Sequence, residues 1–139
     1  MISLEMLYDA KNVLKDIVRL TPLSPAPGIG DGIYIKSENL QLTGSFKLRG
    51  ASYKIHSLTE EEKAKGVIAC SAGNHAQGVA LSATMSGIKS IICMPAGAPL
   101  AKVEATKNYG AEVVLVPGVY DDAYAKAVEL TNEHGYTFA

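Results

Sequence analysis

The sequence predicts an α/β fold, a parallel sheet with helices on both faces, together with part of a second domain. One observation is the regular alternation of short apolar stretches with helical patterns after Gly66. Another is that parallel strands need crossover connections, which helices of this length supply. A third is that residues before Gly66 lack this rhythm. We expect residues 1–50 to be an incomplete part of a large domain and 51–139 a nearly complete small domain that ends in its last strand.

The segment before this rhythm should contain two helices, a loop and a short strand. Ser3 can cap an imperfect amphipathic helix over residues 3–18. Proline and glycine over 21–32 predict loop and turn, and the alternation over 33–36 predicts a strand. After the Thr43-Gly44 turn, Ser45 should cap a helix that continues to about Ser57.

The later elements follow from capping residues and apolar runs. Thr59 before three glutamates has the form of a capping box, so a short helix should begin there and stop at Gly66. Asp121 or Asp122 should cap the last helix. Strands are expected over 67–70, 90–94, 111–116 and 136–139, with helices between them.

Composition excludes several classes of function. Thirteen Lys and Arg against 14 Asp and Glu give no electrostatic reason to expect nucleic acid or an anionic membrane as partner. No apolar run could span a bilayer and no signal peptide is evident, so the cytoplasm is the default location. Cys70 and Cys93 lie in apolar runs, and we expect buried reduced thiols rather than a disulfide. No spacing of ligands predicts a metal site.

Lys47 is an unusual cation, because it lies between Phe46 and Leu48 in the expected first turn of a helix. The positive end of the helix dipole disfavours an ammonium group, and an apolar pocket would favour the neutral amine further. A neutral lysine amine can attack carbonyl carbon and form a Schiff base. On position alone, however, a solvated surface lysine is the more common case.

Residues 71–78 form the second chemistry-bearing stretch. They follow an expected buried strand and open a helix, at the edge of a parallel sheet where ligands bind. A glycine, free helix N–H groups and side-chain donors suit a carboxylate or a phenolic oxygen. The stretch matches neither a dinucleotide fingerprint nor a P-loop. A simple capped turn remains the alternative.

Other polar residues have ordinary explanations. His56 and His134 have no partner at ligand or triad spacing, and Lys102, Lys107 and Lys126 are expected to be solvated helix charges. Ser71 does not lie in a hydrolase-type nucleophile elbow.

Together, residues 37–51 and 71–78 resemble the fold type II pyridoxal-phosphate enzymes, and within them the threonine dehydratases. Residues 94–99, 102–106 and 110–114 continue the similarity, which covers the chain from about Leu20. The resemblance implies pyridoxal 5′-phosphate as cofactor, bound covalently to Lys47, with Phe46 against its ring and Asn74 as partner of its ring oxygen. It also implies that Ser71, Gly73, Asn74 and His75 hold the substrate carboxylate.

The implied reaction is elimination of the β-hydroxyl of threonine or serine, followed by hydrolysis to 2-oxobutanoate or pyruvate and ammonia. Serine racemases resemble this sequence but carry a serine where Ala72 stands, and alanine cannot exchange a proton. The resemblance is greatest to the catabolic, AMP-responsive branch, which places effector residues at Thr43, Gln77 and Asn108 in an oligomer. Leu42 departs from the arginine expected beside Thr43.

The family's phosphate-binding loop has no counterpart in these 139 residues, so the chain looks like a fragment that is inactive alone. Two alternatives stay open. The parent could be another type II enzyme, such as a serine racemase or a hydroxyaspartate dehydratase. The chain could also be a non-catalytic assembly module that pairs through its sheet edge.

Overall fold

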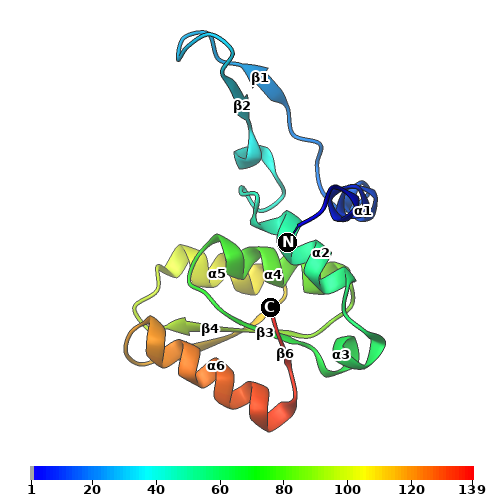
Figure 1. Ribbon diagram of the computed structural model, residues 1–139. Coiled ribbons are helices and arrows are strands. Elements are labelled where there is room, and N and C mark those ends of the chain that lie inside the picture. Colours follow the sequence, from blue (N-terminus) through cyan, green and yellow to red (C-terminus); the bar gives the residue numbers. More distant parts are fainter. Residues whose placement is uncertain (1) are drawn as a thin grey trace.

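The computed structural model describes residues 2–139 and has an α/β body from which a hairpin arm projects (Figure 1). The body contains one four-stranded sheet, in the order β5-β4-β3-β6, and every pair of neighbouring strands is parallel. The parallel α/β architecture expected from the sequence is therefore confirmed. The strands are β3 (Val67–Cys70), β4 (Ser90–Pro95), β5 (Glu112–Val116) and β6 (Thr137–Phe138).

Helices cover both faces of this sheet because successive strand residues point to opposite sides. On one face, Val67, Ala69, Ile92 and Met94 pack with residues of α2 (Lys47–His56), α4 (Asn74–Met85) and α5 (Leu100–Asn108). On the other face, the alternate strand residues pack against Ala123 and Ala127 of α6 (Tyr120–His134). Figure 1 shows α6 on the opposite side of the sheet from α4 and α5.

Two of the expected helix caps are confirmed. The Ser3 side chain accepts from the Met6 N–H at the start of α1 (Leu4–Leu14). Thr59 and Glu62 form a reciprocal capping box at the start of α3 (Glu60–Lys65), and Gly66 ends this helix with a positive φ of 91°.

Two other expected caps are wrong. The residue before α2 is Phe46 and makes no side-chain cap, while the Ser45 hydroxyl is buried without a partner. Likewise α6 begins at Tyr120, so neither Asp121 nor Asp122 precedes it. The Asp122 carboxylate instead accepts from the Val119 N–H, at 2.8 Å. The N-cap position of α2 is one residue after the predicted one, and that of α6 is two or three residues before it.

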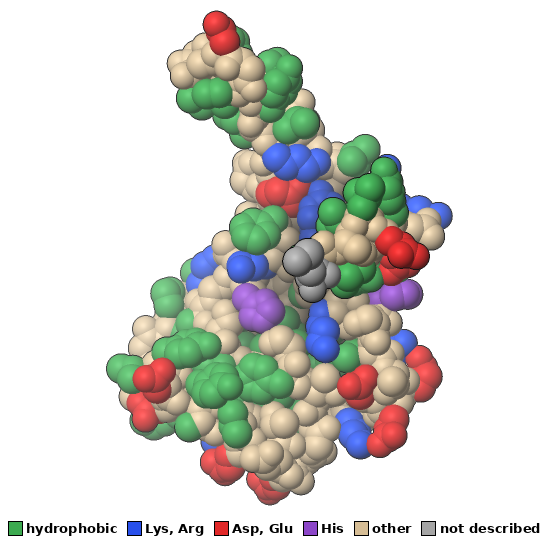
Figure 2. All heavy atoms as spheres, viewed as in Figure 1, with side chains coloured by type: hydrophobic (Ala, Val, Ile, Leu, Met, Phe, Trp, Pro, Cys, Tyr) green, Lys and Arg blue, Asp and Glu red, His purple; other side chains and the backbone are tan. Residues whose placement is uncertain are grey.

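The arm contains a strand that the sequence did not suggest. β1 (Leu23–Pro25) pairs antiparallel with β2 (Tyr34–Lys36), within the region expected to be loop. All residues of both strands are exposed, so no buried face imposes the alternation that identifies a strand. Figure 2 shows hydrophobic side chains exposed over this arm.

A network of polar contacts fixes the base of the arm. Arg49 of α2 donates two hydrogen bonds of 2.8 Å to the carboxylate of Glu38, which begins the short 3-10 helix η1 (Glu38–Leu40). The hydrogen bonds from Arg49 hold the pKa of Glu38 at about 2. Thr21 donates to the same carboxylate, and Lys36 donates to the Thr21 carbonyl. The bonds between Arg49 and Glu38 therefore hold together the two ends of segment 38–49, which contains Lys47.

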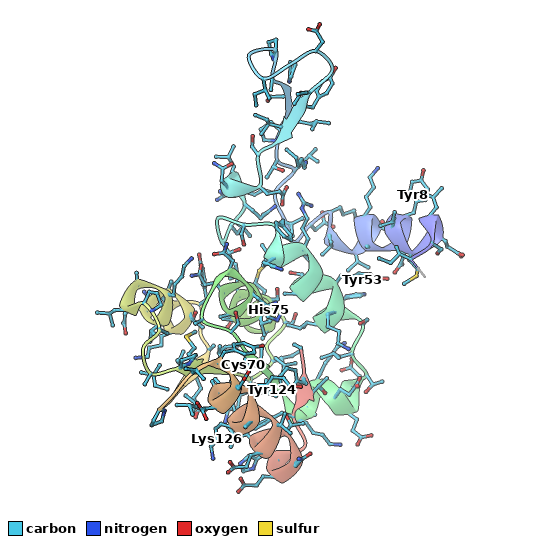
Figure 3. The ribbon with its side chains drawn as sticks, turned by 60° about the vertical axis from the view of Figure 1, so that its left-hand side comes forward. Tyr8, Tyr53, Cys70, His75, Tyr124 and Lys126 are labelled. Carbon is cyan, nitrogen blue, oxygen red and sulfur yellow. The ribbon has the colours of Figure 1, made fainter. Side chains whose placement is uncertain are left out.

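Helix α2 connects the two expected domains. It runs without a break across position 50/51, and Leu48, Ala51 and Ile55 on its inner face are buried. The division at residue 50 therefore falls within one helix, and the assignment of the two parts to a large and a small domain stays a prediction. Towards the other end of this helix, Tyr53, labelled in Figure 3, donates to the Asp9 carboxylate of α1.

Both cysteines are buried free thiols, as expected. They lie opposite each other in the β3–β4 register, and burial raises the pKa of Cys93 to about 11. Among residues 2–139, no helix is both long and apolar enough to cross a membrane. The same residues contain no cluster of three or more potential metal ligands.

Candidate active site

Lys47 is the first residue of α2, as the sequence predicted. The preceding turn uses Gly44 at a φ of 70°, a backbone conformation that other residues rarely adopt. The Lys47 ammonium lies 5.0 Å from the centroid of the Phe46 ring, a cation–π contact. Both side chains are exposed, so in this structure the lysine is not enclosed by the apolar pocket that the sequence suggested.

Gly78 brings α4 against the start of α2. A Cβ atom at this position would lie 3.1 Å from the Lys47 carbonyl carbon and 3.2 Å from the Leu48 nitrogen. Only a residue without a side chain allows the two backbones to come this close. Because α4 begins at the 71–75 turn, this contact holds the lysine beside that turn.

The turn after β3 presents a helix N-terminus to the site. Gly73 precedes α4 and provides no side-chain cap, so the first-turn N–H groups keep their capacity to bind an anion. The Ser71 hydroxyl already accepts a hydrogen bond from the Gly73 N–H, at 3.3 Å, but keeps its own proton to donate to a ligand. The half-buried His75 contacts the Ala139 carbonyl at 3.3 Å through Nε2, which requires the proton to be on this nitrogen.

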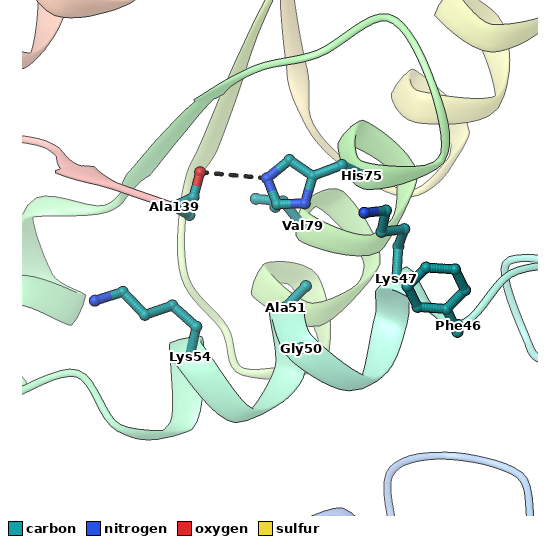
Figure 4. Close-up of a pocket in the computed structure, with 8 residues that line it drawn as sticks. All are labelled: Phe46, Lys47, Gly50, Ala51, Lys54, His75, Val79 and Ala139. Carbon is teal, nitrogen blue, oxygen red and sulfur yellow. Dashed lines mark hydrogen bonds between the residues drawn. The ribbon is translucent and has the colours of Figure 1, made fainter. Parts of the chain in front are cut away.

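Lys47 and His75 line the same pocket, of about 260 Å³ (Figure 4). The pocket lies where strand order reverses, because the chain passes from β3 to β4 and β5 on one side and then returns to β6 on the other. Ligands bind at such switch points in open α/β sheets. The full lining consists of Phe46, Lys47, Gly50, Ala51, Lys54, His75, Val79 and Ala139.

Lys54 is a pocket residue that the sequence analysis missed. It lies seven residues after Lys47 on the same helix, and Gly50 and Ala51 lie between them at the i+3 and i+4 positions. These spacings share one helix face, so the signal was present in the sequence. Ala139 could not be found in the same way, because its place depends on strand order.

Asn74 is exposed at the start of α4 and does not line the pocket itself. Its side-chain oxygen accepts a 2.8 Å hydrogen bond from the ammonium of Lys102 on α5. Lys102 was expected to be a solvated charge; the contact is exposed to water, but α5 packs beside α4 and gives the ammonium a specific partner in Asn74. Lys107 and Lys126, in contrast, pair only with exposed glutamates on their own helices.

The three expected effector residues differ in accessibility. Thr43 and Gln77 are buried, whereas Asn108 is exposed at the end of α5. The neighbouring Tyr109 donates to the Leu42 carbonyl at 3.2 Å and so joins this end of α5 to the segment that contains Thr43. The Thr43 hydroxyl is buried without a hydrogen-bond partner.

Comparison with known proteins identifies the family. The model of the pyridoxal-phosphate dependent enzymes matches residues 14–139. The chain belongs to this family. A chain of this family uses pyridoxal phosphate as its cofactor.

Individual family members show the same similarity over the whole chain. The chain is 48% identical to an L-threonine ammonia-lyase of Thermotoga maritima over 99% of its length, and 48% identical to a catabolic L-threonine dehydratase of Staphylococcus aureus over 98%. The structure of maize serine racemase matches 98% of the chain with a TM-score of 0.92 and 32% identity. The chain spans only 35%, 41% and 43% of these three proteins, respectively.

The residues present fit this cofactor. A primary amine at the rim of a pocket can bind an aldehyde, and the adjacent exposed Phe46 ring offers a flat apolar surface. The unpartnered Thr43 and Ser45 hydroxyls flank the turn before the lysine, and the uncapped start of α4 provides N–H donors. The chemistry of this donor set is that of an aldehyde-binding site beside an anion-binding turn.

Proposed function

We propose that the full-length protein is a pyridoxal-phosphate dependent threonine ammonia-lyase, which converts L-threonine, and also L-serine, to a 2-oxo acid and ammonia. The observation that carries this proposal is that Lys47 and His75, from the two stretches singled out in the sequence, line one pocket at the switch point of the sheet. The identity to threonine ammonia-lyases supports the choice of substrate.

Each site residue has a role that its chemistry allows. The bound cofactor supplies an electron sink for the charge that develops at the substrate α-carbon. Lys47 would hold the cofactor through its amine, and the same amine, when free, would accept the α-proton of the substrate. Ser71, Gly73, Asn74 and His75 hold the substrate carboxylate at the start of α4, where N–H groups favour an anion. Phe46 would pack against the cofactor ring, and Asn74 would donate to its ring oxygen.

The closing test is reduction with borohydride after incubation with pyridoxal phosphate, followed by peptide mapping. We expect label on Lys47. Lys54 is the matched control, because it lines the same pocket from the same helix. Label that persists in Lys47→Met, or that lies on Lys54 alone, would refute the proposed role. A folded chain with no label at all would favour the non-catalytic assembly module.

Serine racemase is the second candidate, favoured by the TM-score of 0.92 to the maize enzyme. Ala72 argues against it, because a methyl group cannot return a proton to the opposite face of the α-carbon. The full-length enzyme should therefore release pyruvate from L-serine without forming D-serine. Formation of D-serine at a comparable rate would reverse the assignment.

We also propose residues 1–50 as part of the large domain and 51–139 as the small one, with the parent a cytoplasmic homo-oligomer. Thr43, Gln77 and Asn108 are proposed effector residues, and AMP is the proposed ligand. The link from Tyr109 to Leu42 supports this set, whereas the burial of Thr43 and Gln77 requires local opening first. An AMP-dependent change in the KM of the full-length enzyme, lost in Asn108→Ala, would test the proposal.

A further inference from the structure

Lys102 and Asn74 form a hydrogen bond outside the pocket lining. The Lys102 ammonium on α5 donates to the Asn74 side-chain oxygen on α4, with 2.8 Å between the two atoms. Lys102 is half-buried, whereas Asn74 is exposed and water reaches the hydrogen bond between them. The contact joins two helices across 28 residues of sequence.

The backbone of α5 holds Lys102 in place. Its N–H donates to the Pro99 carbonyl at 2.8 Å, and its carbonyl accepts from the Thr106 hydroxyl, also at 2.8 Å. The neighbouring Val103 is 3% exposed and Thr106 is fully buried. These buried residues fix the rotation of α5 and thereby direct Lys102 towards α4.

The chemistry of the pair determines how the Asn74 amide is oriented. An ammonium group has three donors and no acceptor, so the amide must turn its oxygen towards Lys102 and its NH₂ group away. The positive charge also polarises the amide and makes the NH₂ group a stronger donor. An amide that was free to flip would offer its oxygen or its nitrogen to a ligand with similar ease.

We propose that Lys102 is a positioning residue, which orients Asn74 so that its NH₂ group donates to the ring oxygen of the cofactor. This inference rests on the proposed function for the identity of the ligand. The Lys102–Asn74 pair itself exists without a ligand, so it can be tested separately.

The first experiment uses the cofactor-free chain and NMR of side-chain amides. The Asn74 signal is assigned by its absence from Asn74→Ala. We expect it to shift in Lys102→Met and to stay near its original position in Lys102→Arg, which also carries only donors. Lys107→Met is the matched control, because Lys107 lies on the same helix and pairs with Glu104. An Asn74 signal unchanged by Lys102→Met would overturn the proposal.

The second experiment measures the affinity and absorption spectrum of pyridoxal phosphate bound to the full-length enzyme. We expect Lys102→Met to weaken binding about five- to tenfold, less than the loss of a direct charge-assisted hydrogen bond because Lys102 acts through Asn74, and to move the absorption band. Lys102→Arg should restore most of the affinity. In the Asn74→Ala background, Lys102→Met should have no further effect, and an undiminished effect there would refute action through Asn74.

These outcomes separate the two proposals. If borohydride reduction leaves no label on Lys47 in the wild-type chain, the result counts against the proposed function, whatever the NMR signal of Asn74 shows. Intact label at Lys47, with wild-type affinity and spectrum in Lys102→Met, would refute the role of Lys102 alone.

Discussion

At the scale of single residues, Gly78 sets the position of Lys47, the residue proposed to hold the cofactor. A Cβ atom at position 78 would lie 3.1 Å from the Lys47 carbonyl carbon, closer than an ordinary van der Waals contact. A side-chain neighbour could rotate away from an added methyl group, but a helix backbone cannot. The backbones of α2 and α4 would have to move apart by a few tenths of an ångström, and Lys47 would move with α2.

We predict that Gly78→Ala destabilises the chain by about 1–2 kcal/mol, the cost of overpacking minus the gain in helix propensity. Urea denaturation measures this change. Gly50→Ala is the control, because Gly50 lies inside α2 with open space around it. That variant should gain up to about 1 kcal/mol. Equal effects of the two substitutions would contradict the close-approach argument.

Glu38 makes a pH-dependent contribution to stability at the same scale. Its pKa falls from 4.5 to about 2, first because of the hydrogen bonds from Arg49. Since the folded form binds fewer protons between these values, the stabilisation is complete above pH 4.5 and is lost as pH falls towards 2. Both side chains keep some exposure to water, which reduces the effect.

Glu38→Gln should therefore lose about 1–2 kcal/mol of unfolding free energy at pH 7 and unfold with a flatter pH dependence between pH 4.5 and 2. Urea midpoints over this pH range provide the measurement. The control is Glu60→Gln, since the Glu60 side chain is 90% exposed. It should change stability by less than about 0.5 kcal/mol. If the stability of Glu38→Gln falls between pH 4.5 and 2 as steeply as that of the wild type, the prediction is contradicted.

At the scale of elements, the helix ends separate what local sequence determines from what it does not. The capping box at α3 is as predicted, because Thr59 and Glu62 are three residues apart and form both bonds without outside help. The start of α2 was misplaced, because it is determined by packing against α4 and not by the Ser45 hydroxyl. A helix cap can be recognised from the sequence when both of its partners lie within the first turn of the helix.

Thr59→Ala should consequently cost about 1 kcal/mol, the usual effect of losing an N-cap side chain. Ser86→Ala is a suitable control, because Ser86 ends α4 through its backbone N–H and is exposed. The comparison is made from thermal unfolding at neutral pH. A loss in Ser86→Ala as large as in Thr59→Ala would mean that the cap bonds are not the cause.

At the scale of the whole molecule, sequence patterning predicted the sheet but not its strand order. Continuous apolar runs identified β3 and β4, whose residues are buried on both faces, and β5 was recognised from its apolar run although it is only partly buried. Strand order has no local signature, so neither the switch point nor the pocket wall at Ala139 could be located. β1 was missed because every residue of the hairpin is exposed, so no buried face imposes an alternation of apolar and polar residues.

The projecting arm should be the first part of the chain that a protease reaches. Among residues 2–139, strands β1 and β2 pair only with each other, and Tyr34 is 60% exposed in a strand of three residues. We expect chymotrypsin to cleave after Tyr34 before it cleaves after Tyr53, whose hydroxyl is bonded to Asp9. Mass spectrometry of early fragments gives the order. An initial cut after Tyr53 would show that the arm is the more protected part.

The contact between His75 and Ala139 has a consequence for the order of events during synthesis. A ribosome delivers Lys47 and the turn after β3 long before it delivers β6, yet β6 pairs with β3 and carries the far wall of the pocket. A nascent chain therefore exposes Lys47 while the pocket is still open on one side. The pocket acquires this wall only after the 64 residues that separate the two partners have been made and folded back.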